Sequence, residues 1–265
     1  MGGYALLIAI TREVSPSMQQ CELTHLPRVG IDVQLARRQH QEYARALAEL
    51  GCKVVSLPAD AALPDSVFVE DIAIVLDELA VIARPGVSSR RDETDAIARA
   101  LAAYRPLATI EPPGTLEGGD VLQLDKMVYV GVSGRSNPAG IDQLTFLLAP
   151  HGYIVKPVEI QSCLHLKSAV TQVGQKTLLI NPAWVKADDF EDMDFVEMDQ
   201  EEPYGGNALL VGETVLYPAS FPNTRKRLEA RGIVVRTIDV AELQKAEGAV
   251  TCCSLIFTSR MAGIE

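Results

Sequence analysis

The feature that most constrains the fold is a repeated unit of two short apolar runs, a helical stretch and a third apolar run. Four pairs of apolar runs are separated by short polar or glycine-containing breaks, as β-hairpins are. These pairs cover residues 67–86, 115–131, 164–182 and 204–218. A fifth pair would join the run after Thr251 to the N-terminal run at 4–12. Because the unit recurs about five times at intervals of 42 to 49 residues, it favours a closed, quasi-symmetric ring.

A helical pattern follows most of the hairpins and precedes another apolar run. The patterns cover residues 32–51, 88–104, 137–152 and 223–232. In the second of them, Ile97, Leu101 and Tyr104 recur at helical spacing on one face. Only the connection around 187–195 is too weak to distinguish a short helix from a loop. No linker-like stretch divides the chain, so we expect one domain over residues 1–265 and not two.

The composition of the chain limits the kinds of partner that it can bind and indicates the cellular compartment. A net charge of −11 argues against binding nucleic acid or anionic membranes, and it would steer a cationic small molecule toward the protein. No apolar stretch approaches the length of a membrane span, and the short N-terminal apolar run lacks the basic flank of a signal peptide. The cysteines are few, odd in number and irregularly spaced: Cys21, Cys52, Cys163, Cys252 and Cys253. This pattern indicates a reducing cytoplasm.

Polar side chains stand at the front of each hairpin, where an apolar strand would not ordinarily begin with them. They are Glu70 and Asp71, Glu117 and Asp120, His165, Asn207, and Cys252. Taking one residue per hairpin, the intervals from Glu70 onward are 47, 48, 42 and 45 residues. If the units surround an axis, these positions are equivalent and converge. Buried carboxylates need partners, so the repeat predicts one central site of cysteine, histidine and carboxylates.

A cysteine in such a site needs help to react. Its free pKa of about 8.5 leaves little thiolate at neutral pH, so a nearby base or cation is required. His165 is one candidate and a positively charged substrate is another. Carboxylates would disfavour a thiolate unless a cation lies between them, and a planar guanidinium suits carboxylate pairing. The same logic gives His165 a carboxylate partner, for which Glu117 is preferred because it would raise the proton affinity of the imidazole.

Six segments in this order resemble one known family. They are LPDSVFVED (63–71), RPGVSSRR (84–91), LEGGD (116–120), GVSGRSN (131–137), LHLKS (164–168) and TCCS (251–254). Together they are similar to the dimethylarginine dimethylaminohydrolases of the guanidine-modifying, arginine deiminase-like superfamily, and they span about residues 30–260. The resemblance implies an α/β fold: a five-bladed, pseudo-symmetric α/β propeller (pentein) of ββαβ units, which agrees with the repeat.

The resemblance also implies roles in a reaction. Cys252 matches the nucleophile, His165 the general acid and base, and Glu117 the carboxylate that holds the histidine. Asp71, with Glu70, matches the carboxylates that bind the guanidinium. The implied reaction hydrolyses a C–N bond of an N-methylated arginine through a covalent S-alkylthiouronium adduct, giving citrulline and methylamine or dimethylamine. Side chains carry all of this chemistry, so no cofactor is expected.

The remaining matches concern the amino-acid end of a small-molecule substrate. Asp65 matches a contact to that end, and Arg90 and Arg135 match two arginines that bind the α-carboxylate. Backbone contacts of the family fall at Leu23 and Ala246. The segment 15–30 corresponds to the family's mobile lid by position only, so Leu23 depends on that placement.

Several alternatives stay open at this point. An arginine deiminase-like hydrolase or an amidinotransferase would use similar residues on a different substrate, and a non-catalytic ligand- or metal-binding relative is a further possibility. Cys163 and His165 lack the spacing of a structural zinc motif, so no physiological metal is expected, although adventitious zinc could bind Cys252 and His165. Cys253 is predicted to face the core, because side chains alternate along a strand. The oligomeric state, monomer or homodimer, is left undecided.

Overall fold

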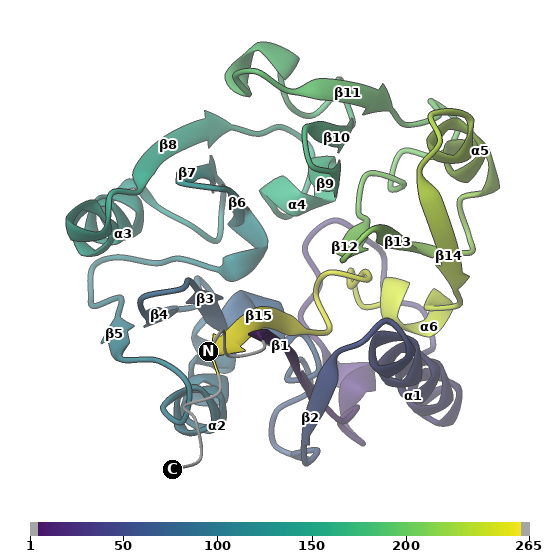
Figure 1. Ribbon diagram of the computed structural model, residues 1–265. Helices are drawn as coiled ribbons and strands as arrows, with labels where there is room; N and C mark the ends of the chain where they lie inside the picture. Colours follow the sequence, from purple (N-terminus) through teal and green to yellow (C-terminus); the bar gives the residue numbers. More distant parts are fainter. Residues whose placement is uncertain (1–4, 261–265) are drawn as a thin grey trace.

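Five three-stranded sheets surround a common centre in the computed structural model, which describes residues 5–260 (Figure 1). In each sheet an antiparallel hairpin is extended by a third strand that runs parallel to the hairpin's second strand. The first strands, β3, β6, β9, β12 and β15, lie toward the centre, and the third strands lie outside (Figure 1). The predicted five-bladed α/β propeller is confirmed.

Three blades follow the predicted order of hairpin, helix and strand. The first of them contains β3 (Ala73–Val75), β4 (Ala80–Ile82), α2 (Thr94–Leu101) and β5 (Leu107–Thr109). The next contains β6 (Val121–Leu124), β7 (Met127–Val132), α3 (Pro138–Leu148) and β8 (Ile154–Glu159). Another contains β12 (Leu209–Val211), β13 (Thr214–Pro218), α5 (Pro222–Ala230) and β14 (Val234–Ile238), followed by α6 (Ala241–Gln244).

The blade between them has the weak connection noted in the sequence. It contains the short helix α4 (Leu166–Ala169), β9 (Val170–Gly174), β10 (Thr177–Ile180), the 3-10 turn η6 (Ala187–Asp189) and β11 (Asp194–Glu197). The other 3-10 segments are η1 (Met18–Gln20), η2 (Val69–Ile72), η3 (Ser88–Glu93), η4 (Gly118–Asp120) and η5 (Ala149–His151). The helix predicted over 88–104 therefore begins as the 3-10 segment η3 and ends at Leu101.

The two ends of the chain close the ring. Strand β15 (Leu255–Arg260) pairs antiparallel with β1 (Ala5–Arg12), and β2 (Lys53–Leu57) runs parallel to β1 after helix α1 (Val33–Glu49). The register runs from Ala5 opposite Arg260 to Ile10 opposite Leu255. The predicted fifth hairpin is confirmed, but its first arm begins at Leu255. Cys252 and Cys253 lie in the turn before it, so their placement on a strand was wrong.

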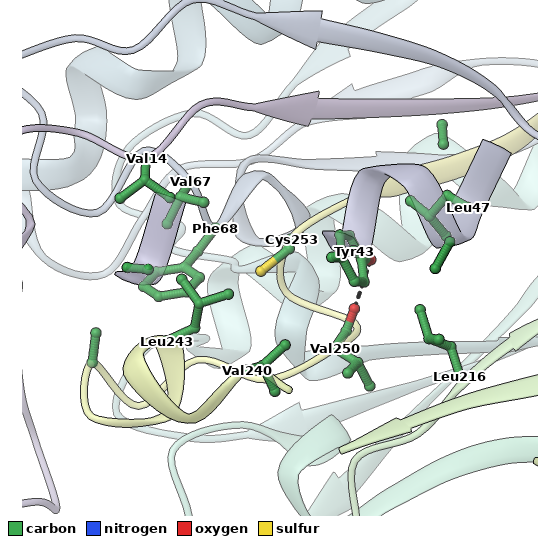
Figure 2. Packing of buried hydrophobic residues seen from close by; sticks show 14 of the residues in the cluster. Val14, Tyr43, Leu47, Val67, Phe68, Leu216, Val240, Leu243, Val250 and Cys253 are labelled. Carbon is green, nitrogen blue, oxygen red and sulfur yellow. Dashed lines mark hydrogen bonds between the residues drawn. The ribbon is translucent and has the colours of Figure 1, made fainter. Parts of the chain in front are cut away.

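Helix α1 fixes the turn that carries these cysteines. Asp32 caps the helix by accepting hydrogen bonds from the Gln34 and Leu35 amides, and the buried face includes Tyr43, which is fully buried. The Tyr43 hydroxyl donates to the Val250 carbonyl oxygen at 2.7 Å (Figure 2). It also lies 2.6 Å from the Ser254 hydroxyl. A helix of the closing blade thus holds both ends of the turn 250–254.

Candidate active site

The chain enters the first strand of each blade through a short segment that carries polar side chains. Glu70 and Asp71 lie on η2, Glu117 precedes η4, and His165 precedes α4. Cys252 lies in the turn before β15. The structure brings His165, Glu117, Asp71 and Cys252 together at the centre of the ring, as the intervals in the sequence suggested.

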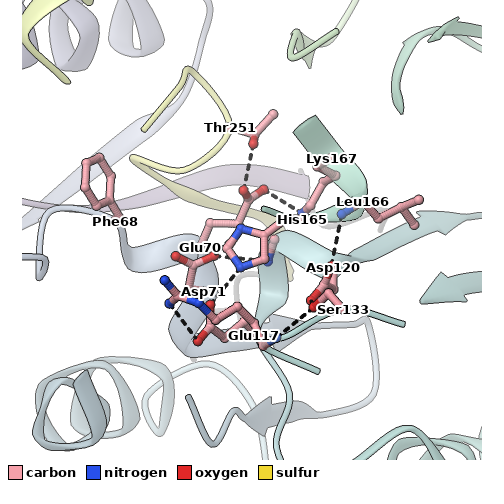
Figure 3. Close-up of polar contacts among 12 residues, drawn as sticks. Phe68, Glu70, Asp71, Glu117, Asp120, Ser133, His165, Leu166, Lys167 and Thr251 are labelled. Atoms are coloured by element: carbon pink, nitrogen blue, oxygen red, sulfur yellow. Dashed lines mark hydrogen bonds and ion pairs between the residues drawn. The ribbon is translucent and has the colours of Figure 1, made fainter. Parts of the chain in front are cut away.

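The centre of the site is a buried histidine–carboxylate pair. His165 Nε2 lies 2.7 Å from Glu117 Oε2, and Nδ1 lies 3.8 Å from Asp71 Oδ1 (Figure 3). Burial alone would lower the pKa of His165, but the charges of Asp71, Asp120 and Glu117 raise it to about 9. Burial would likewise raise the pKa of Glu117, but the hydrogen bond and charge of His165 hold it at about 2. The imidazole is therefore protonated at neutral pH.

Gly119 allows the histidine to approach Asp71 so closely. A Cβ atom at this position would lie 2.6 Å from His165 Nδ1 and 2.7 Å from Asp71 Oδ1. The Gly119 amide also donates to Asp71 Oδ1 at 3.2 Å. The glycines of the LEGGD segment therefore do more than form a turn: they allow side chains of the site to pack closely.

Asp71 is paired with Arg90 inside the protein. Arg90 Nη1 donates to Asp71 Oδ2 at 2.7 Å. Its remaining contacts are to Glu93, from Nε at 3.2 Å and Nη2 at 2.9 Å, and to the Phe68 carbonyl oxygen at 3.2 Å. Of the five N–H groups of a guanidinium, these contacts leave one free among residues 5–260. Arg90 is thus largely committed to neighbouring side chains.

The two adjacent cysteines have different surroundings. Cys252 is half-buried and lines a cavity with His165 and Asp71, whereas Cys253 is fully buried and points into the cluster around Tyr43 and Phe68 (Figure 2). Burial, followed by the charges of Glu70 and Asp71, raises the pKa of Cys252 well above its usual range. The expected thiol form in the free protein therefore has burial as its main cause, before the carboxylates.

Glu70 faces a different part of the centre. Its carboxylate accepts hydrogen bonds from Lys167 Nζ and from Thr251 Oγ1, each at 2.6 Å (Figure 3). These three residues border a cavity of about 290 Å³ that is lined by residues from the first strands of all five blades. Asn207, at the equivalent position of its own blade, donates to Lys167 and Thr251 and so has a structural contact here.

Seven of the residues singled out in the sequence line the catalytic cavity: Asp65, Asp71, Arg90, Arg135, His165, Ala246 and Cys252. Leu23, Glu70 and Glu117 lie outside its walls. Five further residues complete the walls and were not anticipated: Glu22, Phe68, Leu164, Glu247 and Gly248. The space open to water is about 20 Å³, which is close to the minimum for one water molecule. An arginine side chain therefore fits only if a wall of the cavity moves, and we call residues 22–26, which begin with the lining residue Glu22, the covering segment.

The covering segment is held by hydrogen bonds to Asp65, Ser89, Arg135 and Glu247. The Glu22 amide donates to Asp65 at 3.1 Å, and Arg135 Nη2 donates to Thr24 Oγ1 at 2.9 Å. The carboxylate of Glu247 accepts hydrogen bonds from three successive backbone amides, at residues 24, 25 and 26. Glu247 itself has a φ of 58°, which is unusual for a residue with a side chain. Nothing in the local sequence distinguishes Glu247 from a surface glutamate.

One group of side chains among residues 5–260 is compact enough to be considered for a metal ion. One ligand atom each of Asp71, Glu117 and His165 lies within 4.8 Å of the others. The hydrogen bond to Glu117 already occupies His165 Nε2, and Arg90 neutralises Asp71. The ion pairs account for this group without a metal.

Comparison with known proteins places this geometry in a family. The family model for eukaryotic N,N-dimethylarginine dimethylhydrolases matches residues 27–257. The chain belongs to this family. An N(G),N(G)-dimethylarginine dimethylaminohydrolase of Streptomyces coelicolor is 37% identical over 250 residues, covering 93% of this chain and 95% of that one.

Two solved structures of dimethylarginine dimethylaminohydrolases are also similar. A cysteine-to-serine mutant of the Pseudomonas aeruginosa enzyme, complexed with citrulline, has a TM-score of 0.91 and 34% identity, and the match covers 96% of this chain and 100% of that chain. A histidine-to-glycine variant, as an adduct with S-methyl-L-thiocitrulline, has a TM-score of 0.89 and 34% identity, covering 94% and 98%. The family resemblance noted in the sequence is confirmed.

Proposed function

We propose that this chain hydrolyses N-methylated arginine, such as dimethylarginine, to citrulline and methylamine or dimethylamine. The observation that carries the proposal is the buried His165, held by Glu117 beside the Cys252 thiol and the Asp71 carboxylate, whose neighbouring carboxylates raise its pKa to about 9. A thiol supplies a nucleophile, an imidazolium supplies a proton for a departing amine, and a carboxylate accepts a guanidinium. Membership of the dimethylarginine dimethylhydrolase family supports the same substrate class.

The reaction begins when a substrate guanidinium binds beside Asp71. Its positive charge offsets the field of the carboxylates, and Cys252 loses its proton to solvent. The Cys252 sulfur then bonds to the guanidinium carbon. His165 donates its proton to the departing amine as the C–N bond breaks, which leaves an S-alkylthiouronium on Cys252.

The second half of the reaction uses the same histidine as a base. Neutral His165 takes a proton from water, and the resulting hydroxide bonds to the thiouronium carbon. The C–S bond then breaks as the hydroxyl proton of the adduct passes to the sulfur, so citrulline leaves, Cys252 is a thiol again, and His165 keeps the proton that it took from water. The negative charge of Glu117 stabilises the imidazolium at both ends of this cycle.

The amino-acid end of the substrate would contact the other side of the cavity. Arg135 donates to Thr24 and, at 3.4 Å, to Glu117, so it keeps more free N–H groups than Arg90 for an α-carboxylate. We therefore assign the main carboxylate contact to Arg135 and give Arg90 the task of orienting Asp71. Asp65 and the backbone at Leu23 and Ala246 are proposed to bind the α-amino group.

The remaining features of the proposal concern the whole protein. No helix within residues 5–260 is both long and apolar enough to cross a membrane. The five cysteines are free thiols, which suits the reducing cytoplasm that we propose as the compartment. We propose that residues 1–265 act as one α/β-propeller domain, as a monomer or a homodimer.

The test is to supply the purified protein with asymmetric dimethylarginine, arginine, citrulline and agmatine, and to assay amine and ureido products. We expect citrulline and dimethylamine from the first substrate only. Ammonia release from arginine would favour a deiminase, and loss of the amidino group to an added amine would favour an amidinotransferase. Cys252→Ser should abolish turnover in a folded protein, whereas Cys253→Ser should keep substantial activity; the reverse result would mean that Cys253 is the nucleophile.

A further inference from the structure

We propose that Asp120 is a positioning residue of the reaction assigned above: a buried anion that fixes the chain beside His165 and stabilises the protonated imidazole. The inference rests on the proposed function, in which His165 must hold a proton for the departing amine. Asp120 is fully buried at the end of η4, and none of its atoms lines the catalytic cavity. It acts through other residues and does not touch the substrate.

The hydrogen bonds around Asp120 leave its carboxylate only one role, that of acceptor. Ser133 Oγ lies 2.6 Å from Oδ2, and the Leu166 amide donates to Oδ1 at 3.0 Å (Figure 3). Ser136 Oγ lies 2.7 Å from Oδ2. Ser133 Oγ already accepts two backbone N–H groups, and Ser136 Oγ accepts one. The Ser133 hydrogen is therefore left for Asp120, and the Ser136 hydroxyl also donates to it. Three donors and no acceptor match an ionised carboxylate.

The same bonds tie Asp120 to three functional residues. The Ser136 hydroxyl accepts from the Glu117 amide at 3.0 Å, and the Ser133 hydroxyl accepts from the Arg135 amide at 2.9 Å. Leu166, whose amide binds Asp120, directly follows His165 in the chain. One carboxylate thereby anchors the backbone at the acid–base residue, at its carboxylate partner and at the proposed carboxylate-binding arginine.

Within residues 5–260, the hydrogen-bond partners of Asp120 are uncharged, so its negative charge is not neutralised by them. The negative charges of Asp71, Asp120 and Glu117 raise the pKa of His165; of the other two, Asp71 pairs with Arg90 and Glu117 approaches Arg135 at 3.4 Å. Among residues 5–260, no lysine or arginine forms an ion pair with Asp120. A buried anion without a cation is costly, so the imidazolium of His165 is the group that compensates it. The coupling is mutual: the anion favours the proton on His165, and the proton favours the anion.

The experiment measures the pKa of His165 directly, by NMR titration of the protein carrying isotope-labelled histidine. The chain has 4 histidines, so His165→Gly identifies the signal. Asp120→Asn keeps the shape but removes the charge, and we expect the pKa of His165 to fall by about one pH unit or more. Ser133→Ala removes one donor but keeps the charge, and should leave the pKa within about 0.3 pH units.

A second readout separates protonation from general damage. A substrate whose leaving group needs no proton, such as S-methylthiocitrulline, should lose less kcat in Asp120→Asn than dimethylarginine does. Equal losses on both substrates with an unchanged His165 pKa would overturn the proposal and leave Asp120 a structural role only. If Asp120→Asn does not fold, the smaller Asp120→Ser is titrated in its place.

The wild-type protein provides a test that needs no variant. A His165 that titrates at or below about 6.5, its ordinary value, would show that no carboxylate holds its proton and would refute the inference. Failure of the proposed function looks different, because a wild-type protein that makes no citrulline can still show a His165 pKa that depends on Asp120.

Discussion

Replacing Glu117 by glutamine should destabilise the folded protein by an amount that depends on pH in a defined way. Glutamine has the shape of a protonated glutamate, so the variant removes the charge and keeps the packing. In the wild type, Glu117 titrates at about 2 instead of 4.5, and its partner His165 titrates at about 9 instead of 6.5. Each displacement of about 2.5 pH units corresponds to about 3 kcal/mol. Asp71 and Asp120 raise the pKa of His165 before Glu117 does, whereas the pKa of Glu117 is lowered mainly by His165, so the Glu117 displacement alone sets the contribution of the pair at about 3 kcal/mol.

The pH window follows from the direction of each displacement. The lowered pKa of Glu117 gives stability that is present above pH 4.5 and is lost as the pH falls through about 2. The raised pKa of His165 gives stability that is present below pH 6.5 and is lost as the pH rises through about 9. The full contribution therefore lies between pH 4.5 and 6.5, and it declines above that range.

Urea denaturation of both proteins at about pH 6 and about pH 9.5 measures this difference. We expect a deficit of about 3 kcal/mol for Glu117→Gln at the lower pH and a much smaller one at the higher pH. Glu78→Gln serves as the control, because Glu78 pairs with Lys126 at 2.8 Å on the surface and such pairs contribute little. A deficit of equal size at both pH values would refute the assigned ionisation of the pair.

Three further predictions concern packing, the covering segment and the nucleophile. A Cβ atom on Gly248 would lie 2.1 Å from a ring carbon of Phe68, so Gly248→Ala should lower the free energy of unfolding in urea by about 1–3 kcal/mol. A Cβ atom on Gly134 would have nothing within 4 Å, so Gly134→Ala should leave the free energy of unfolding almost unchanged. Equal losses in the two variants would contradict the packing argument. Glu247→Ala should raise hydrogen exchange of the amides at 24–26 about tenfold or more without affecting β1; unchanged exchange would mean that other contacts hold the segment. Thiolate absorbance should show Cys252 as a thiol at neutral pH and as a thiolate once an unreactive guanidinium binds; a thiolate already present in the free protein would argue for a preformed cysteine–histidine ion pair.

The architecture and the central residues of the site can be predicted from local patterns in the chain. Alternating apolar runs, their breaks and the helical faces are local signals, and five copies of the unit can bury their apolar sides only against one another. The equivalent front positions therefore have to meet near the axis, which places Glu117, His165 and Cys252 together. The closing hairpin followed from the same count, since four complete hairpins left one arm at each end of the chain.

The use of each side chain depends on contacts that form only in the folded protein. Glu70 turns to Lys167, 97 residues away, and Arg90 is taken by Asp71, 19 residues away. Glu247 holds the Thr24 amide across 223 residues. The two neighbouring thiols point in different directions because they lie in a turn and not on a strand: Cys253 lies in the core and Cys252 lines the cavity. A buried charge selects its partner by distance and geometry, and for pairs this far apart in the chain those are properties of the folded protein alone.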